Sequence, residues 1–85
     1  MISQKDFFSK NMDDMIQTLF REGTFVVSIR YYKYKINLYL LSNFYVEVFY
    51  NHKFDKIERI ELLKRNTKRV KFYADQISLP SNLLS

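Results

Sequence analysis

The stretch that most constrains the fold of this chain is residues 34–51, YKINLYLLSNFYVEVFYN. Its two halves, 36–41 and 44–50, are rich in β-branched and aromatic residues, which fit a pleated sheet better than a helix. Side chains in both halves alternate with a period of two, as in a strand. Ser42 and Asn43 separate the halves, and Asn tolerates a positive φ. The stretch therefore predicts a β-hairpin with a two-residue turn.

Both faces of this hairpin are apolar, although a half-buried sheet usually alternates apolar with polar residues. The first face is expected to carry Ile36, Leu38, Leu40, Phe44, Val46, Val48 and Tyr50. The second is expected to carry Tyr39, Leu41, Tyr45 and Phe49. Something has to cover part of this second face. A small core also favours oligomers, so we expect a homodimer that packs sheet against sheet through these four residues.

An amphipathic helix is predicted over residues 3–22, before the strands. Ser3 can cap its first turn, and Gly23 stands where a residue in the left-handed conformation often ends a helix. The apolar residues that recur at helical spacing are Phe8, Met12, Met15, Ile16 and Leu19.

Strands are predicted at about 24–32, 34–41, 44–51 and 57–63, with a turn near Tyr32 and Lys33. Residues 56–63 also fit the helical period, but the hairpin before them favours a strand. Residues 67–77 are predicted to form a short helix that ends before Pro80. A strand is the alternative there, because basic residues at a helix start oppose its dipole. Leu83 and Leu84 follow, either docked or loose.

The order helix, four strands, helix predicts one α+β domain over residues 1–85. We expect an antiparallel four-stranded β-meander with the helices packed on one face, as a two-layer α/β sandwich. The chain has no cysteine, which favours a reducing, cytoplasmic setting. Its start lacks the features of a signal peptide, and its apolar runs are too short to span a bilayer. We therefore expect no membrane partner.

No catalytic, cofactor or metal motif stands out. The single glycine excludes the usual Gly-rich phosphate loops. Asp13 and Asp14 are adjacent on the predicted helix, so their side chains point about 100° apart and cannot chelate one ion together. His52 is the only histidine and lies in a predicted turn, where a surface role is the commoner one. We expect no cofactor and no metal.

Glu47 is a carboxylate in the middle of a predicted strand, flanked on its face by Tyr45 and Phe49. Desolvation there would raise the pKa of the carboxyl, as an acid catalyst requires. The alternative, which we prefer, is a cross-strand ion pair. The partners considered for that pair are Arg30, Lys35 and Arg59.

The net charge of +5 includes two basic clusters. Their candidate nucleic-acid contacts are Arg30, Lys33 and Lys35 in the first, and Arg65, Lys68 and Arg69 in the second. Cations beside tyrosines are typical of surfaces that bind single-stranded nucleic acid. The alternative is a basic face that only solubilises the protein.

Three functions follow from these observations. The first is a small non-enzymatic protein-interaction domain that self-associates as a homodimer, with another protein as a possible further partner. The second is a basic nucleic-acid-binding accessory or a small regulatory protein of the toxin–antitoxin kind, an analogy drawn from size and charge alone. The third is an enzyme built around Glu47 or His52, which we favour least.

Overall fold

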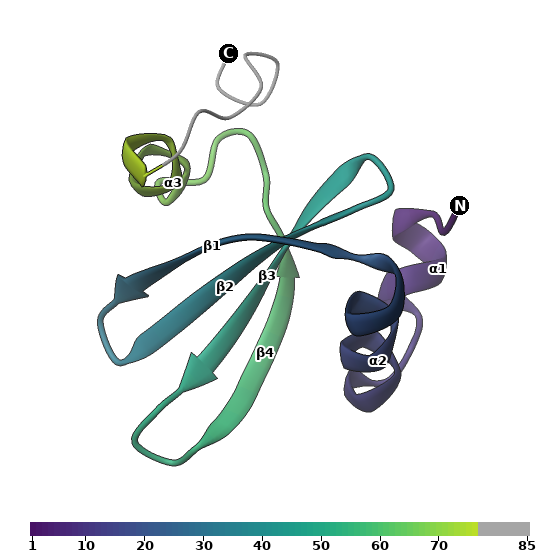
Figure 1. Cartoon of the computed structure of the whole chain (residues 1–85), viewed down its shortest axis with the longest axis horizontal. Helices are drawn as coiled ribbons and strands as arrows, with labels where there is room; N and C mark the ends of the chain where they lie inside the picture. Colours follow the sequence, from purple (N-terminus) through teal and green to yellow (C-terminus); the bar gives the residue numbers. More distant parts are fainter. Residues whose placement is uncertain (77–85) are drawn as a thin grey trace.

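The computed structural model describes residues 1–76, so the expectations for Ile77, Pro80, Leu83 and Leu84 lie outside the described residues. Two helices precede four strands, and one helix follows them (Figure 1). The strands form one antiparallel sheet in the order β1-β2-β3-β4. The predicted α+β fold with a four-stranded meander is confirmed. The elements are α1 Gln4–Phe8, α2 Met12–Glu22, β1 Thr24–Tyr31, β2 Tyr34–Leu41, β3 Phe44–Asn51, β4 Lys56–Leu62 and α3 Val70–Gln76.

Two-residue turns join β1 to β2 and β2 to β3, at the predicted positions. Their first residues adopt the left-handed conformation, with φ of 58° at Tyr32 and 55° at Ser42. A positive φ at this position matches the right-handed twist of the flanking strands. The positive φ of the second turn thus lies on Ser42, whereas Asn43 was the expected carrier.

The predicted helix over residues 3–22 is two helices, α1 and α2. The Ser9 hydroxyl at the end of α1 donates a hydrogen bond to the Asp6 carbonyl at 2.8 Å. The Asn11 side chain then accepts one from the Asp14 amide at 2.9 Å and caps α2. Short polar side chains that bond to the local backbone favour helix ends over helix interiors. Ser9 and Asn11 therefore end one helix and start the next.

Gly23 follows α2 with φ −85° and ψ 161°, which is extended backbone and not the expected left-handed conformation. Its amide donates to the Leu19 carbonyl at 2.9 Å. A Cβ at this position would lie 2.8 Å from the same carbonyl oxygen. Glycine is therefore favoured here because the backbone of Gly23 lies close to the Leu19 carbonyl, and not because of a positive φ.

The helices lie on both faces of the sheet, which differs from the expected placement of all helices on one face (Figure 1). We call the side covered by α1 and α2 the α2 face, and the side covered by α3 the α3 face. The buried residues of the α2 face are Phe7, Leu19, Leu41, Phe44, Val46 and Val48. Those of the α3 face are Ile29, Ile36, Leu38, Phe49, Leu63, Val70 and Tyr73. The chain's own helices thus cover residues from both apolar faces of the hairpin.

Candidate interaction surfaces

The structure divides the four expected interface residues between the two faces. The two-residue turn pairs Leu41 with Phe44, so Tyr39 and Leu41 lie on the α2 face. Tyr45 and Phe49 lie on the α3 face. Leu41 is 1% exposed and Phe49 is 0% exposed, so neither side chain can meet a partner. A shift of one residue in the strand register moves a whole set of side chains to the other face, which is why these four residues do not share a face. We therefore place the dimer interface elsewhere.

Glu47 is fully buried on the α3 face, where its partners are Arg69, the residue before α3, and Tyr73 of α3. Arg69 Nε lies 2.7 Å from Glu47 Oε2, and Arg69 Nη2 lies 2.9 Å from Oε1. The Tyr73 hydroxyl donates to Oε2 at 2.8 Å. The expected cross-strand pair of Glu47 with Arg30, Lys35 or Arg59 is therefore wrong, and Arg59 pairs with Glu61 instead. The residue that neutralises Glu47 is 22 positions away in the sequence.

Two of these groups, Arg69 and Tyr73, have raised pKa values. Hydrogen bonding to Glu47 raises the pKa of Arg69 above its usual value. Burial, and then the negative charge of Glu47, raise the pKa of the Tyr73 phenol in the same way. Arg69 therefore stays charged and Tyr73 stays a hydroxyl donor over the ordinary pH range. This arrangement anchors α3 to the sheet.

A second polar network fixes the turn between β3 and β4. Asn51, 1% exposed, accepts hydrogen bonds from the amides of Lys53 and Phe54 at 3.0 and 3.4 Å. Its amide group donates to Glu58 Oε2 at 2.6 Å, and the Tyr34 hydroxyl donates to Oε1 at 2.9 Å. These bonds lower the pKa of Glu58. Asn51 was not among the residues expected to matter, although an Asn before a polar loop signals this kind of turn.

The first candidate surface is a stripe of side chains along α2. It consists of Asp13, Ile16, Gln17, Phe20 and Arg21, which line a shallow hollow on the surface. Their spacing of three, four, seven and eight residues places them on one side of the helix. Phe20 is 71% exposed, so a large ring lies in solvent. We call this set the α2 stripe; it has an acid at its start, a base at its end and apolar residues between.

The apolar part of the α2 stripe continues onto the sheet. Ile16 and Phe20 also line a small cavity against Asn37 and Tyr39 of β2. Phe25 on β1 is 54% exposed, and its ring centroid lies 5.7 Å from that of Tyr39. The exposed apolar surface therefore extends from α2 across the open part of the α2 face.

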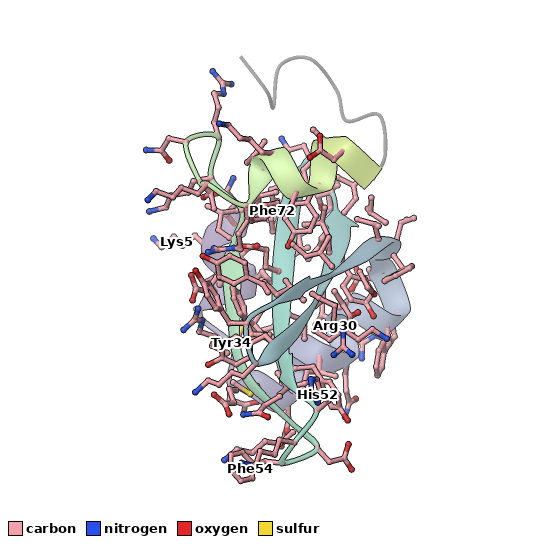
Figure 2. All side chains as sticks on the ribbon, turned by 90° about the vertical axis from the view of Figure 1, so that its left-hand side faces the viewer. Lys5, Arg30, Tyr34, His52, Phe54 and Phe72 are labelled. Atoms are coloured by element: carbon pink, nitrogen blue, oxygen red, sulfur yellow. The ribbon has the colours of Figure 1, made fainter. Side chains whose placement is uncertain are left out.

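The second candidate surface is the end of the sheet that carries both the β1–β2 turn and the β3–β4 turn. It comprises residues 30–35 and 51–58, and we call it the hairpin end (Figure 1). Arg30 and Lys35 stand directly opposite each other on β1 and β2. Both line a groove that also includes His52. Figure 2 shows Arg30 and His52 on the same side of the molecule, with Phe54 at the tip of its hairpin.

The two basic clusters predicted from the sequence do not join into one surface. Arg30, Lys33 and Lys35 lie at the hairpin end. Arg65 lines a hollow with Asn43, at the opposite end of the sheet. Lys68 is exposed on the connection before α3. Arg69 faces inward to Glu47, so it is removed from the candidate nucleic-acid contacts.

Comparisons with protein families, with curated proteins and with solved structures find no match. Within residues 1–76, no helix is long and apolar enough to cross a membrane. In the same part of the chain, no three His, Cys, Asp or Glu residues are grouped so that they could hold a metal ion.

Proposed function

We propose that this chain is a small non-enzymatic protein-interaction domain that forms a homodimer through the α2 stripe. The observation that carries the proposal is that the stripe is complementary to itself. Asp13 and Arg21 lie at its two ends, with Gln17 midway between them. A two-fold axis beside Gln17 would place Asp13 of each copy against Arg21 of the other. An interface that repeats the same patch on both subunits is the usual form of a homodimer.

Two further features favour this pairing. Antiparallel α2 helices would align their dipoles favourably, with the acidic first turn of one copy beside the basic last turn of the other. Ile16 and Phe20 would pack against the same residues of the second copy. Burying an exposed Phe contributes about 1.5–3 kcal/mol, and aromatic anchors usually dominate interfaces. One helix stripe is a small interface, so we expect a dissociation constant on the order of micromolar.

The first test is the solution mass of the wild type and of Phe20→Ser, followed by light scattering over a range of concentrations. We expect a dimer for the wild type and a shift of the dissociation constant of about tenfold or more for Phe20→Ser. The matched control is Phe54→Ser, which removes an exposed ring outside the stripe. A wild type that stays monomeric at high concentration would contradict the proposal.

Charge reversal tests the geometry of the pairing. Asp13→Arg and Arg21→Asp should each weaken the dimer, because each places like charges together across the axis. The double variant restores opposite charges and should recover most of the affinity. Asp14→Arg is the control, because it makes the same charge change in the same helical turn but off the stripe. If the double variant is as weak as the two single variants combined, the antiparallel pairing is wrong.

The assignment as a non-enzyme is supported by the bonding of Glu47. Both of its carboxylate oxygens accept hydrogen bonds from Arg69 or Tyr73, which suits an anchor more than an acid catalyst. We keep the cytoplasm as the proposed location, supported by the absence of cysteine.

A further inference from the structure

Arg30 and Lys35 form an unusual cross-strand pair. Like charges directly opposite each other on neighbouring strands are destabilising. Within residues 1–76, neither side chain forms an ion pair that would offset this repulsion. His52 lines the same groove and can donate a further hydrogen bond. A bound anion would turn this repulsion into attraction, because it would neutralise both cations at once.

The charge around this pair is mostly positive, although Asp75 of α3 lines a second hollow with Arg30. The hairpin end carries the five cations Arg30, Lys33, Lys35, Lys53 and Lys56. Its two carboxylates leave a formal net charge of +3 (5 − 2), and both accept hydrogen bonds within the chain. Asp55 accepts a hydrogen bond from Tyr50, and Glu58 accepts from Asn51 and Tyr34. The cations therefore produce a positive field at this end of the molecule, and that field attracts a ligand with several negative charges.

Each turn at the hairpin end presents an aromatic ring to solvent. Tyr32 is 88% exposed and Phe54 is 64% exposed. Hairpin tips usually carry Gly, Asn or Asp. Tyr32 also adopts a φ of 58°, a conformation that costs energy for a bulky residue. Tyr32 packs edge-on against Tyr31, with 4.7 Å between the ring centroids, and the Lys53 ammonium lies 5.8 Å from the centre of the Phe54 ring. Neither ring belongs to the core, so most of each ring remains available to a ligand.

We propose that the hairpin end binds single-stranded nucleic acid. Backbone phosphates would lie over Arg30 and Lys35, and unpaired bases would stack on Tyr32 and Phe54. Charge for the backbone and rings for the bases are the two features that such surfaces combine. A duplex would use the cations but offer no free base to the rings. This site is separate from the α2 stripe, so one dimer can carry two sites.

Binding is measured by fluorescence anisotropy with labelled DNA and RNA strands of about ten nucleotides. We expect both strands to bind at low salt, with an affinity that falls steeply as salt is added. A duplex of the same length should bind more weakly. Inorganic phosphate at the same charge concentration should compete poorly, since it cannot stack.

Two pairs of variants separate charge from stacking. Arg30→Gln with Lys35→Gln should reduce the slope of log affinity against log salt by about 1.4, which is the value for two lost phosphate contacts. The matched control is Arg65→Gln with Lys68→Gln, which removes the same charge at the other end of the sheet. Tyr32→Asn with Phe54→Ser should weaken binding at least about fivefold per ring. Asn tolerates the positive φ at position 32, and Phe20→Ser controls for the loss of an exposed ring.

The proposal is overturned if the strands do not bind at low salt. It is also overturned if both charge pairs have the same effect, because the binding is then only a response to net charge. Equal binding of duplex and single strand, with no effect of Tyr32→Asn and Phe54→Ser, would leave an anion site without base stacking and would likewise reject it. Phe20→Ser must disrupt the dimer without lowering the affinity per chain, which keeps the failure of one proposal distinct from that of the other.

Discussion

Different kinds of interaction hold the helices to the two faces of the sheet. Among residues 1–76, the α2 face buries one polar side chain, Thr18, which bonds to the Asp14 carbonyl of its own helix. The α3 face buries an ion pair: Glu47 is bound by Arg69, the residue before α3, and by Tyr73 of α3. Apolar contact has no direction, whereas a bidentate pair fixes the position of both partners. Contacts on the α2 face therefore stabilise the protein mainly through buried apolar area. The bonds to Glu47 on the α3 face also fix where α3 lies on the sheet.

This difference follows from the lengths of the helices. α2 has eleven residues and packs with α1 over a broad apolar surface. α3 has seven residues, too few for a stable helix in isolation. The side chain of Arg69, directly before α3, reaches across the ring of Phe49 to Glu47, with 5.1 Å between the guanidinium carbon and the ring centroid. Three hydrogen bonds to Glu47 and this contact with Phe49 fix the position of α3 on the sheet. Apolar contacts alone would fix that position less precisely.

The largest expected effect comes from removing the centre of the α3 face. Glu47→Ala should lower the free energy of unfolding by about 3–5 kcal/mol, because Arg69 loses the partner of its buried charge. Urea unfolding measures the change. Glu61→Ala is the control, since its ion pair with Arg59 is half exposed and should contribute about 1 kcal/mol or less. A cost of Glu47→Ala as small as that of the control would reject the anchor.

The comparison is sharpened by replacing the ionic trio with apolar residues. Glu47→Met, Arg69→Met and Tyr73→Phe together should recover most of the stability that Glu47→Ala loses, since buried ion pairs often exchange for apolar residues at little cost. The α3 face should then resemble the α2 face and hold α3 less specifically. Amide hydrogen exchange in α3 should increase even where urea unfolding shows recovered stability. Unchanged exchange would mean that directed bonds are not what places α3.

A smaller effect is expected where α2 meets the sheet. Gly23→Ala should destabilise the protein by about 1–3 kcal/mol, because the new Cβ would crowd the Leu19 carbonyl. Thermal unfolding gives the sign and size, and Ser9→Ala in the linker between α1 and α2 provides a control that adds no bulk. If Gly23→Ala stabilises the protein, the close approach of these two segments is not a constraint.

The smallest effect concerns pH, and we expect it from the polar network of Glu58. Hydrogen bonds lower the pKa of Glu58 in the folded state below its ordinary value of 4.5. The group therefore adds stability above pH 4.5, and this stability is lost as the pH falls through the lowered pKa. The free energy of unfolding of the wild type should fall between neutral and acid pH, and that of Glu58→Gln should fall less. Parallel curves for the wild type and Glu58→Gln, measured by unfolding at several pH values, would contradict this.

Much of the fold was predictable because it depends on local periodicity. The alternation in residues 34–51 and the short polar turn at Ser42 and Asn43 were enough for the central hairpin. The break at Ser9 and Asn11 was also readable, since both residues favour helix ends. The division of Tyr39 from Tyr45 between the faces follows from the two-residue turn and was open to the same reasoning.

The rest depends on contacts between distant parts of the chain. Glu47 and Arg69 meet only because α3 crosses back over the sheet, and no local pattern shows that crossing. The hairpin end also depends on residues far apart in the sequence, because the order of the strands brings the turns at Tyr32 and Phe54 to the same end of the sheet. Side chains of the α2 stripe belong to a predicted helix, but which of them stay exposed depends on how α2 docks.

The most direct test of the proposed dimer uses the absence of cysteine in this chain. Gln17→Cys would place a single thiol beside the proposed two-fold axis, where packed helices bring side chains within reach of a disulfide. Mild oxidation should then link two copies, while Lys68→Cys, exposed on the connection to α3, should remain mostly monomeric. Non-reducing electrophoresis resolves the two outcomes. Equal linkage of both variants, or no linkage of Gln17→Cys at high concentration, would contradict self-association through α2.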